Sequence, residues 1–169
     1  MRQAKLNKEF LARHLFSIAV FAILGSWFGI DAFVRYPETP ARELYATIEK
    51  APPPESMSAA DLEAFKAQKT STQRILAALV LAAGAAASLH LAKTAMFRFE
   101  FDEEGFSAGG AKRAWRDVEK ADFSKWDSKR IFKIEAKGLS ATLDAWHHTG
   151  VEEAKTFCEK ALSAGKETA

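Results

Sequence analysis

Few side chains in this 169-residue chain have the type and spacing that chemistry requires. Asp31 lies near the end of a long apolar segment, where an ionisable group can serve an ion or proton pathway. Arg35 follows it by one helical turn, so the spacing favours an i,i+4 ion pair at a membrane edge over such a pathway. His147 and His148 are adjacent, so on a strand they point to opposite faces and cannot chelate one metal together.

The remaining candidates for chemistry are two histidines and one cysteine. His14 and His90 lie near the same expected end of two apolar segments, and a histidine pair on facing helices can ligate a haem. In a hairpin with matched ends they are offset by about five residues, or about 7.5 Å, which disfavours a shared haem. Cys158 is the only cysteine, which excludes an intrachain disulfide and a multi-cysteine zinc site. With no phosphate-binding glycine loop or nucleophile elbow either, we expect no catalytic residue, metal or cofactor, and a chain that is not an enzyme.

The elements that position these residues are dominated by two apolar segments. Residues 15–34 contain one charge, Asp31, and residues 75–92 contain no Asp, Glu, Lys or Arg. Helices of this length span about 30 Å, the thickness of a bilayer core. We therefore expect transmembrane helices over 15–35 and 74–96. The first is expected to be an uncleaved anchor, because its apolar run is longer than that of a signal peptide and no clear cleavage site follows.

The distribution of charge predicts the orientation in the membrane. Residues 1–14, expected to form a basic tail, carry a net charge of +3, whereas the connecting loop of 36–73 carries −2. Lys and Arg accumulate on the cytoplasmic side, so we expect a membrane protein that crosses twice, with both termini in the cytoplasm. The overall charge of +2 argues against a nucleic-acid-binding protein.

The loop outside the membrane is expected to be largely helical. Pro37 and Pro40 are expected to stop the first apolar helix, and residues 41–50 can form a short helix. Ser58 and Asp61 have the spacing of a capping box, from which one helix could run unbroken through the second apolar segment.

Small residues spaced by four occur in both apolar segments. Gly25 and Gly29 lie in the first, and Gly84 and Ser88 lie in the second. Such spacing lets two helix backbones approach closely in lipid. Either the two helices pack on each other as an antiparallel hairpin, or one small-residue face binds a partner subunit or a second copy. The two interpretations are not exclusive.

After Phe97 the apolar period changes from helical to two. Phe97, Phe99 and Phe101 alternate with charged residues, which is typical of a half-buried strand. Gly109-Gly110 and Lys137-Gly138 indicate turns between later strands. We expect strands or strand-like segments at 97–101, 106–108, 113–119, 121–127, 130–136 and 140–146.

The chain is expected to close with an amphipathic helix. Thr149 and Glu152 have the spacing of a capping box, and apolar residues follow at helical intervals. Gly165 is expected to end this helix, leaving a tail of 165–169. The predicted fold class is therefore α+β: a transmembrane hairpin, then a small antiparallel β module over 97–164 that the last helix covers.

Short motifs inside the module suggest a family. A strand with a D-x-x-G turn opens it and a W-x-D-V segment follows, carried by Phe101, Asp102, Gly105, Phe106, Trp115, Asp117 and Val118. This order resembles the small bacterial pleckstrin-homology-like (PH-like) domains of membrane proteins of uncharacterised function. The resemblance covers residues 97–164, and it implies a binding or scaffolding role without catalytic residues.

The charge of the module bears on what it binds. Lys112, Arg113 and Arg116 form a local basic cluster that could contact anionic headgroups. Residues 98–169 as a whole carry a net charge of −1, so the module offers no large positive field. We therefore expect it to contact protein rather than a specific lipid headgroup.

Two tryptophans are candidates for such a contact, since tryptophan is enriched at binding hot spots. Trp126 and Trp146 could anchor an interface or could pack in the module's own core. Together with the resemblance, the two apolar segments lead us to expect an integral protein of the bacterial inner membrane. Its expected function is non-catalytic docking, scaffolding or assembly through the cytoplasmic PH-like module. The alternative is an accessory subunit of a larger membrane complex, attached through the small-residue helix faces.

Overall fold

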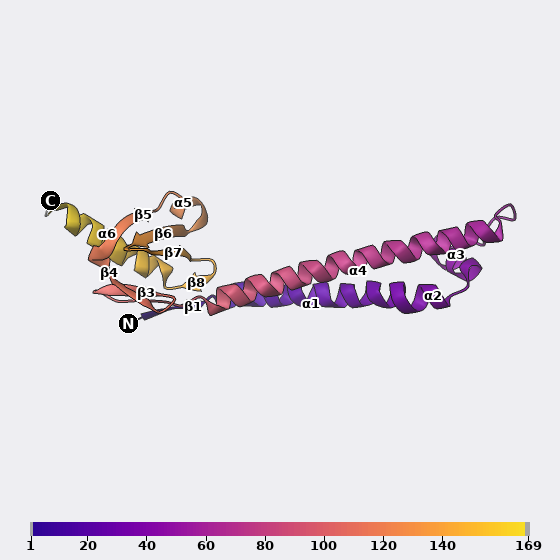
Figure 1. Ribbon diagram of the computed structural model, residues 1–169, viewed down its shortest axis with the longest axis horizontal. Coiled ribbons are helices and arrows are strands. Elements are labelled where there is room, and N and C mark those ends of the chain that lie inside the picture. The colour runs from indigo at the N-terminus through magenta and orange to yellow at the C-terminus, as the bar shows by residue number, and fades with distance from the viewer. Residues whose placement is uncertain (1, 168–169) are drawn as a thin grey trace. The chain divides into compact units, whose positions relative to one another are not determined.

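The computed structural model describes the backbone of residues 2–167 and the side chains of residues 2–164. The chain forms two compact units. We call Met1–Arg13 together with His90–Ala169 the β unit, and His14–Leu89 the helical unit. The helices α1 (Lys8–Ile30) and α4 (Ala59–Met96) continue from one unit into the other (Figure 1).

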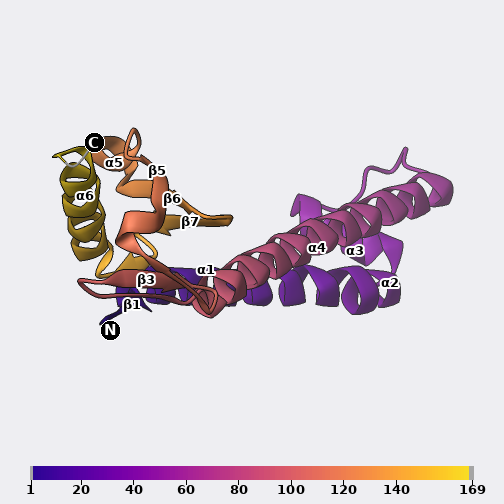
Figure 2. The ribbon, with the colours of Figure 1, turned by 60° about the vertical axis from the view of Figure 1, so that its left-hand side comes forward.

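The helical unit consists of two long apolar helices and a folded connection. A π-helical turn (Asp31–Arg35) and α2 (Tyr36–Glu38) continue α1 without a break, and α3 (Ala41–Glu49) leads toward α4. Figures 1 and 2 show α1 and α4 side by side. Both Lys8–Glu38 and Ala59–Met96 are long and apolar enough to cross a membrane, and only 17% and 11% of their most apolar stretches are buried.

The π-helical turn accommodates a proline. Pro37 has no N–H, and a proline ring in a regular helix clashes with the carbonyl four residues earlier, here that of Phe33. The N–H of Tyr36 bonds to the carbonyl of Asp31, five residues back, which widens the helix at this point. The helix therefore continues through Pro37 and ends at Glu38, before Pro40.

The connection between the long helices is folded as the sequence predicts. The N–H of Ser58 donates to the Asp61 carboxylate at 3.0 Å, and the N–H of Asp61 donates to the Ser58 hydroxyl at 3.2 Å, which confirms the capping box. The ring of Tyr45 on α3 packs against Phe65 with centroids 4.8 Å apart. From Ala59, α4 runs 38 residues without interruption, or about 57 Å.

The β unit contains two antiparallel sheets and the C-terminal helix α6 (Val151–Glu167), which Figure 2 shows beside them. The first sheet has the strand order β4-β3-β2-β1-β8 and the second has the order β5-β6-β7. The strands in chain order are β1 (Arg2–Leu6), β2 (Phe99–Phe101), β3 (Gly105–Ala108), β4 (Ala111–Ala114), β5 (Val118–Asp122), β6 (Ile131–Ala136), β7 (Leu139–Asp144) and β8 (His148–Thr149).

The N-terminal segment is part of the first sheet, which corrects the expectation of a basic tail over residues 1–14. β1 pairs with β2 on one side and with β8 on the other. Ala4 points into the core and is 4% exposed. The segment RQAKL has little apolar alternation of its own, so its strand forms only because two partner strands from far along the chain lie on either side of it.

The middle of the β unit also departs from the predicted strands. A 3₁₀ turn (Trp115–Asp117) divides the segment predicted over 113–119 into the end of β4 and the start of β5. The strand predicted over 121–127 ends at Asp122, because Trp126 begins the short helix α5 (Trp126–Lys129). Trp115 and Trp126, whose apolar character suggested strands in the sequence, both reach the core from these turns.

The start of α6 differs from the predicted capping box. The Thr149 hydroxyl donates to the Lys5 carbonyl at 3.3 Å, and the helix begins at Val151 after Gly150, whose φ is +82°. Thr149 is therefore a strand residue of β8 and not the cap. The helix also continues past Gly165 to Glu167, so the predicted tail is shorter, and residues 168–169 lie outside the described residues.

The two predicted glycine turns are confirmed as two-residue hairpin loops. Gly109-Gly110 joins β3 to β4 with φ of +58° and +87°, and Lys137-Gly138 joins β6 to β7 with φ of +41° and +79°. Positive φ at both positions is what a type I′ turn requires. The two sheets and α6 enclose a hydrophobic core. The largest fully buried side chains of this core are Phe99, Phe101, Phe106, Phe132, Ile134, Leu143, Val151 and Cys158.

Candidate functional site

The D-x-x-G turn between β2 and β3 is held by one aspartate. A carboxylate oxygen of Asp102 accepts hydrogen bonds from the N–H groups of Glu104 and Gly105, both at 3.0 Å. The backbone N–H of Asp102 donates to the Gly105 carbonyl at 2.9 Å, and the backbone carbonyl of Asp102 accepts the indole N–H of Trp115 at 2.7 Å. The carboxylate and both backbone groups of Asp102 therefore maintain the turn.

Gly105 is required by a close approach of two strands. A Cβ at this position would lie 2.2 Å from the carbonyl oxygen of Arg113 and 3.0 Å from the Cα of Ala114. Both atoms belong to the backbone of β4, which pairs with β3 here. No side chain fits without moving that strand.

The W-x-D segment fixes the 3₁₀ turn. Trp115 is buried between Phe106 and Phe157, with ring centroids at 4.9 and 6.5 Å. The Asp117 carboxylate accepts the N–H of Ala114 at 3.3 Å and forms an ion pair with Lys137 at 2.6 Å, an interaction that lowers the pKa of that carboxyl. The residues that carry the PH-like resemblance thus have structural contacts that explain their types.

The predicted basic cluster is divided by the structure. Lys112 and Arg113 are consecutive on β4 and so point to opposite faces. The Arg113 guanidinium donates to the carbonyls of Lys112 at 2.8 Å and Lys137 at 3.3 Å, so it is engaged with backbone. Lys112 and Arg116 are exposed.

The two candidate tryptophans have different environments. Trp126 is 9% exposed and packs edge-on against Phe132 at 5.8 Å, so it belongs to the core. Trp146 is 42% exposed, and the guanidinium of Arg13 lies 4.9 Å from its ring centre. The opposite outcomes follow from the backbone, since Trp126 begins α5 and Trp146 lies in the loop between β7 and β8.

Trp146 borders an open hollow of about 560 Å³. We call it the Trp146 hollow; Lys129, Arg130, Asp144 and Glu152 also line it. An exposed tryptophan beside an arginine, here Trp146 and Arg130, is a combination enriched at protein-binding surfaces. This is the part of the β unit that best fits the predicted protein contact.

The structure brings together His90 and His147, which lie far apart in the sequence. Their ring centroids are 5.5 Å apart, and the ring of Phe10 lies 6.2 Å from His90 and 4.5 Å from His147. A carboxylate oxygen of Asp144 lies 3.4 Å from Nδ1 of His147. These contacts join the start of α1, the end of α4 and the loop before β8. Within the described residues, no group of three or more His, Cys, Asp or Glu is placed to hold a metal ion.

His148 and Cys158 are both buried. The ring of His148 donates from Nε2 to the carbonyl of Thr94 at 3.2 Å, which satisfies a carbonyl in the last turn of α4. Burial lowers the pKa of His148. Burial also raises the pKa of the Cys158 thiol to about 11, so the thiol stays protonated and serves core packing, as predicted.

No family model, no curated protein and no solved structure matches this chain.

The small residues of the helical unit differ in their surroundings. A Cβ at Gly25 would lie 2.6 Å from the side chain of Leu81, and one at Gly84 would lie 3.1 Å from Cβ of Phe21. A Cβ at Gly29 would meet nothing within 4 Å. Ser88 is exposed, and its hydroxyl donates to the Gly84 carbonyl of its own helix at 2.9 Å. Two of the four positions thus lie at the contact between the helices.

Asp31 forms the predicted i,i+4 ion pair. A carboxylate oxygen of Asp31 lies 3.1 Å from the guanidinium of Arg35, which also lies 5.6 Å from the ring centre of Trp27. Asp31 is 7% exposed, so the pair neutralises a nearly buried charge. This arrangement accounts for the one charge inside the first apolar segment.

Sequence reasoning missed the residues whose partners lie far along the chain. Phe10 is 1% exposed although it lies in a segment expected to be a solvated tail. Its partners His90 and His147 belong to other elements, and no periodic pattern links the three. The one local signal was that Phe10 is a large apolar side chain in the otherwise charge-rich segment of residues 2–13.

Proposed function

We propose that the chain is an integral protein of the bacterial inner membrane that crosses the bilayer twice and carries a non-catalytic docking module in the cytoplasm. The observation that carries this proposal is the pairing of β1 with β2. β1 precedes the first apolar helix and β2 follows the second. The pairing ties both ends of a hairpin to one folded unit.

The surfaces of α1 and α4 support the membrane part of the proposal. Large apolar side chains such as Phe16, Ile23 and Leu79 are 72%, 66% and 63% exposed. A soluble protein rarely exposes contiguous apolar surface on this scale, whereas hydrocarbon chains would cover it. The excess of Lys and Arg in residues 1–14 supports the cytoplasmic side for the β unit.

The form of the β unit supports docking through a PH-like module. Two antiparallel sheets with a closing helix surround a core that the D-x-x-G and W-x-D residues organise. The Trp146 hollow supplies a surface for a protein partner, and a helical hairpin would hold that surface near the membrane.

The orientation is tested by cysteine labelling of intact cells, with Cys158→Ala as background. A membrane-impermeant maleimide is expected to modify Ser56→Cys, in the connection before α4, and to miss Ala164→Cys on α6. Permeabilised cells serve as the control, in which both positions react. Labelling of Ala164→Cys alone in intact cells would overturn the orientation.

Docking is tested by a photo-crosslinking amino acid placed at Ala145, in the Trp146 hollow, and at Lys120, an exposed residue of β5 outside that hollow, as the matched control. A discrete adduct to another protein is expected at Ala145 and not at Lys120. Adducts to lipid alone at both positions would contradict docking through this surface.

The alternative, an accessory subunit of a membrane complex, is favoured by the open surroundings of Gly29. A small residue with free space beside it lets another helix approach closely. Native mass spectrometry after gentle detergent extraction tests this alternative. A homogeneous monomer without a co-purifying partner would exclude it.

A further inference from the structure

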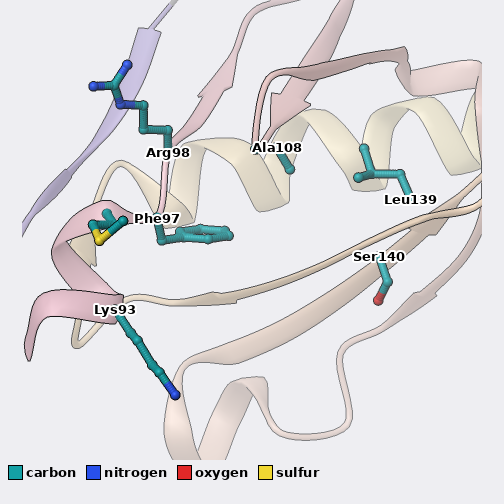
Figure 3. Close-up of a pocket in the computed structure, with 8 residues that line it drawn as sticks. Lys93, Phe97, Arg98, Ala108, Leu139 and Ser140 are labelled. Carbon is teal, nitrogen blue, oxygen red and sulfur yellow. The ribbon is translucent and has the colours of Figure 1, made fainter. Parts of the chain in front are cut away.

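A second open hollow, of about 450 Å³, lies within the β unit, beside the last turn of α4. We call it the Lys93 hollow; it is lined by Lys93, Met96, Phe97, Arg98, Ala108 and Leu139, among others. In Figure 3 the ring of Phe97 points into it, and Lys93 and Arg98 extend away from each other on its two sides.

The wall of the hollow is apolar and its rim is cationic. Met96 is 79% exposed, so its apolar side chain is open to contact with a ligand. The exposed side chains of Lys93 and Arg98 form no ion pair or hydrogen bond with the residues that the structure describes. No Asp or Glu lines the hollow, so its positive charge has no counter-charge there.

The position along the chain sets the depth of the hollow. Lys93 directly follows residues 75–92, the second apolar segment. If α4 crosses the bilayer as proposed above, the side chain of Lys93, the first charge after that segment, extends outward to the phosphate groups, and Met96 lies nearly one turn further along, at the lipid interface.

We propose that the Lys93 hollow binds one anionic phospholipid. The lipid phosphate pairs with the ammonium group of Lys93, and the part of an acyl chain nearest the phosphate lies against the apolar side chains of Met96 and Phe97. A pocket of this volume is within the range that holds small ligands. The inference rests on the proposed membrane location, and it assigns lipid contact to a place other than the predicted cluster around Lys112.

The test is a lipid titration of the full chain in a non-ionic detergent, followed by native mass spectrometry. Phosphatidylglycerol is expected to bind saturably with one molecule per chain and more tightly than phosphatidylcholine. Lys93→Gln is expected to weaken phosphatidylglycerol binding about fivefold, since a basic residue near a membrane surface contributes on that order. The matched control Lys112→Gln should bind as the unaltered chain does.

Three results would overturn the proposal: equal binding of the two lipids, unchanged binding by Lys93→Gln, or an equal loss in Lys112→Gln. Inorganic phosphate at millimolar concentration should not displace the lipid, and displacement would show a simple anion site. Circular dichroism of Lys93→Gln checks that the variant is folded.

The extraction step separates this proposal from the proposed function. If detergent is needed to recover the chain but the titration fails, only the lipid site is wrong. If the chain is recovered in the soluble fraction without detergent, the proposed membrane location and the lipid site are both wrong.

Discussion

Gly105 lies where the backbone of β4 leaves no room for a side chain on β3. A Cβ would lie 2.2 Å from the Arg113 carbonyl oxygen, which is fixed by the pairing of the two strands. At the scale of single residues, the D-x-x-G sequence is thus explained by backbone contact and by the hydrogen bonds of Asp102, and not by a ligand.

We expect Gly105→Ala to destabilise the β unit by about 3 kcal/mol, the upper range for overpacking, because the obstructing atoms are backbone. Urea unfolding of the detergent-solubilised chain, followed by tryptophan fluorescence, measures the change. Gly29→Ala is the matched control, since a Cβ there meets nothing within 4 Å. Equal stability of the two variants would contradict the close approach.

We expect His148 to make the stability of the β unit depend on pH. Its pKa is lowered because it is buried, while the hydrogen bond to Thr94 and the charge of Asp144 act in the opposite direction. A histidine with a lowered pKa in the folded state takes up a proton more readily when unfolded. Stability is therefore complete above the ordinary pKa of about 6.5 and falls as the pH drops below it.

We expect His148→Gln to reduce this loss of stability between pH 7.5 and pH 5.5, because glutamine can donate to the Thr94 carbonyl without titrating. Thermal unfolding of both chains at the two pH values provides the comparison. Parallel losses in the two chains would show that His148 is not the group responsible.

At the scale of elements, the contact between α1 and α4 depends on two glycines on different helices. Gly25 admits Leu81, and Gly84 admits Phe21. Helices in lipid associate through such close packing, because burial of apolar surface gives little driving force there. Gly29, four residues from Gly25, lies outside this contact.

We expect Gly25→Leu to separate the two helices and Gly29→Leu to leave them packed. The measurement is disulfide formation between Phe21→Cys and Gly84→Cys in a Cys158→Ala chain, whose Cβ positions are 3.1 Å apart. Gly25→Leu should slow oxidation at least about tenfold, the effect of roughly 1.4 kcal/mol on the closed state. Unchanged oxidation in Gly25→Leu would show that the helices do not depend on this contact.

At the scale of the whole molecule, the β unit is built from both ends of the chain. β1 occupies an inner position of the five-stranded sheet, between β2 and β8. Further contacts join distant parts of the chain. Phe10, near the start of α1, packs against His90, near the end of α4, and both contact His147 in the loop before β8.

We therefore expect Ala4→Asp to unfold residues 98–164, although the substitution precedes the first apolar helix. Ala4 is 4% exposed, and a carboxylate placed there has no partner, which costs several kcal/mol. Trypsin should cleave the β unit of this variant faster than that of the control Gln3→Ser, whose side chain is exposed. Equal rates of cleavage would show that β1 is dispensable.

Local features of the sequence were sufficient for the long helices and the turns. Residues 15–34 and 75–92 are apolar over their whole length, and this alone determines long apolar helices. Gly109-Gly110 and the capping box of Ser58 with Asp61 also act within a few residues, so their hydrogen bonds and backbone angles follow from neighbouring residues. The i,i+4 pair of Asp31 and Arg35 is local in the same sense.

Tertiary structure alone decided which distant residues meet. Nothing near Arg2–Leu6 indicates a strand, because its hydrogen-bonding partners are supplied by β2 and β8. The same holds for the meeting of His90 with His147, and for the exposure of Trp146 when Trp126 is buried. Periodicity in a sequence reports which face of an element is apolar, whereas the choice of partner depends on through-space packing that a one-dimensional pattern does not contain.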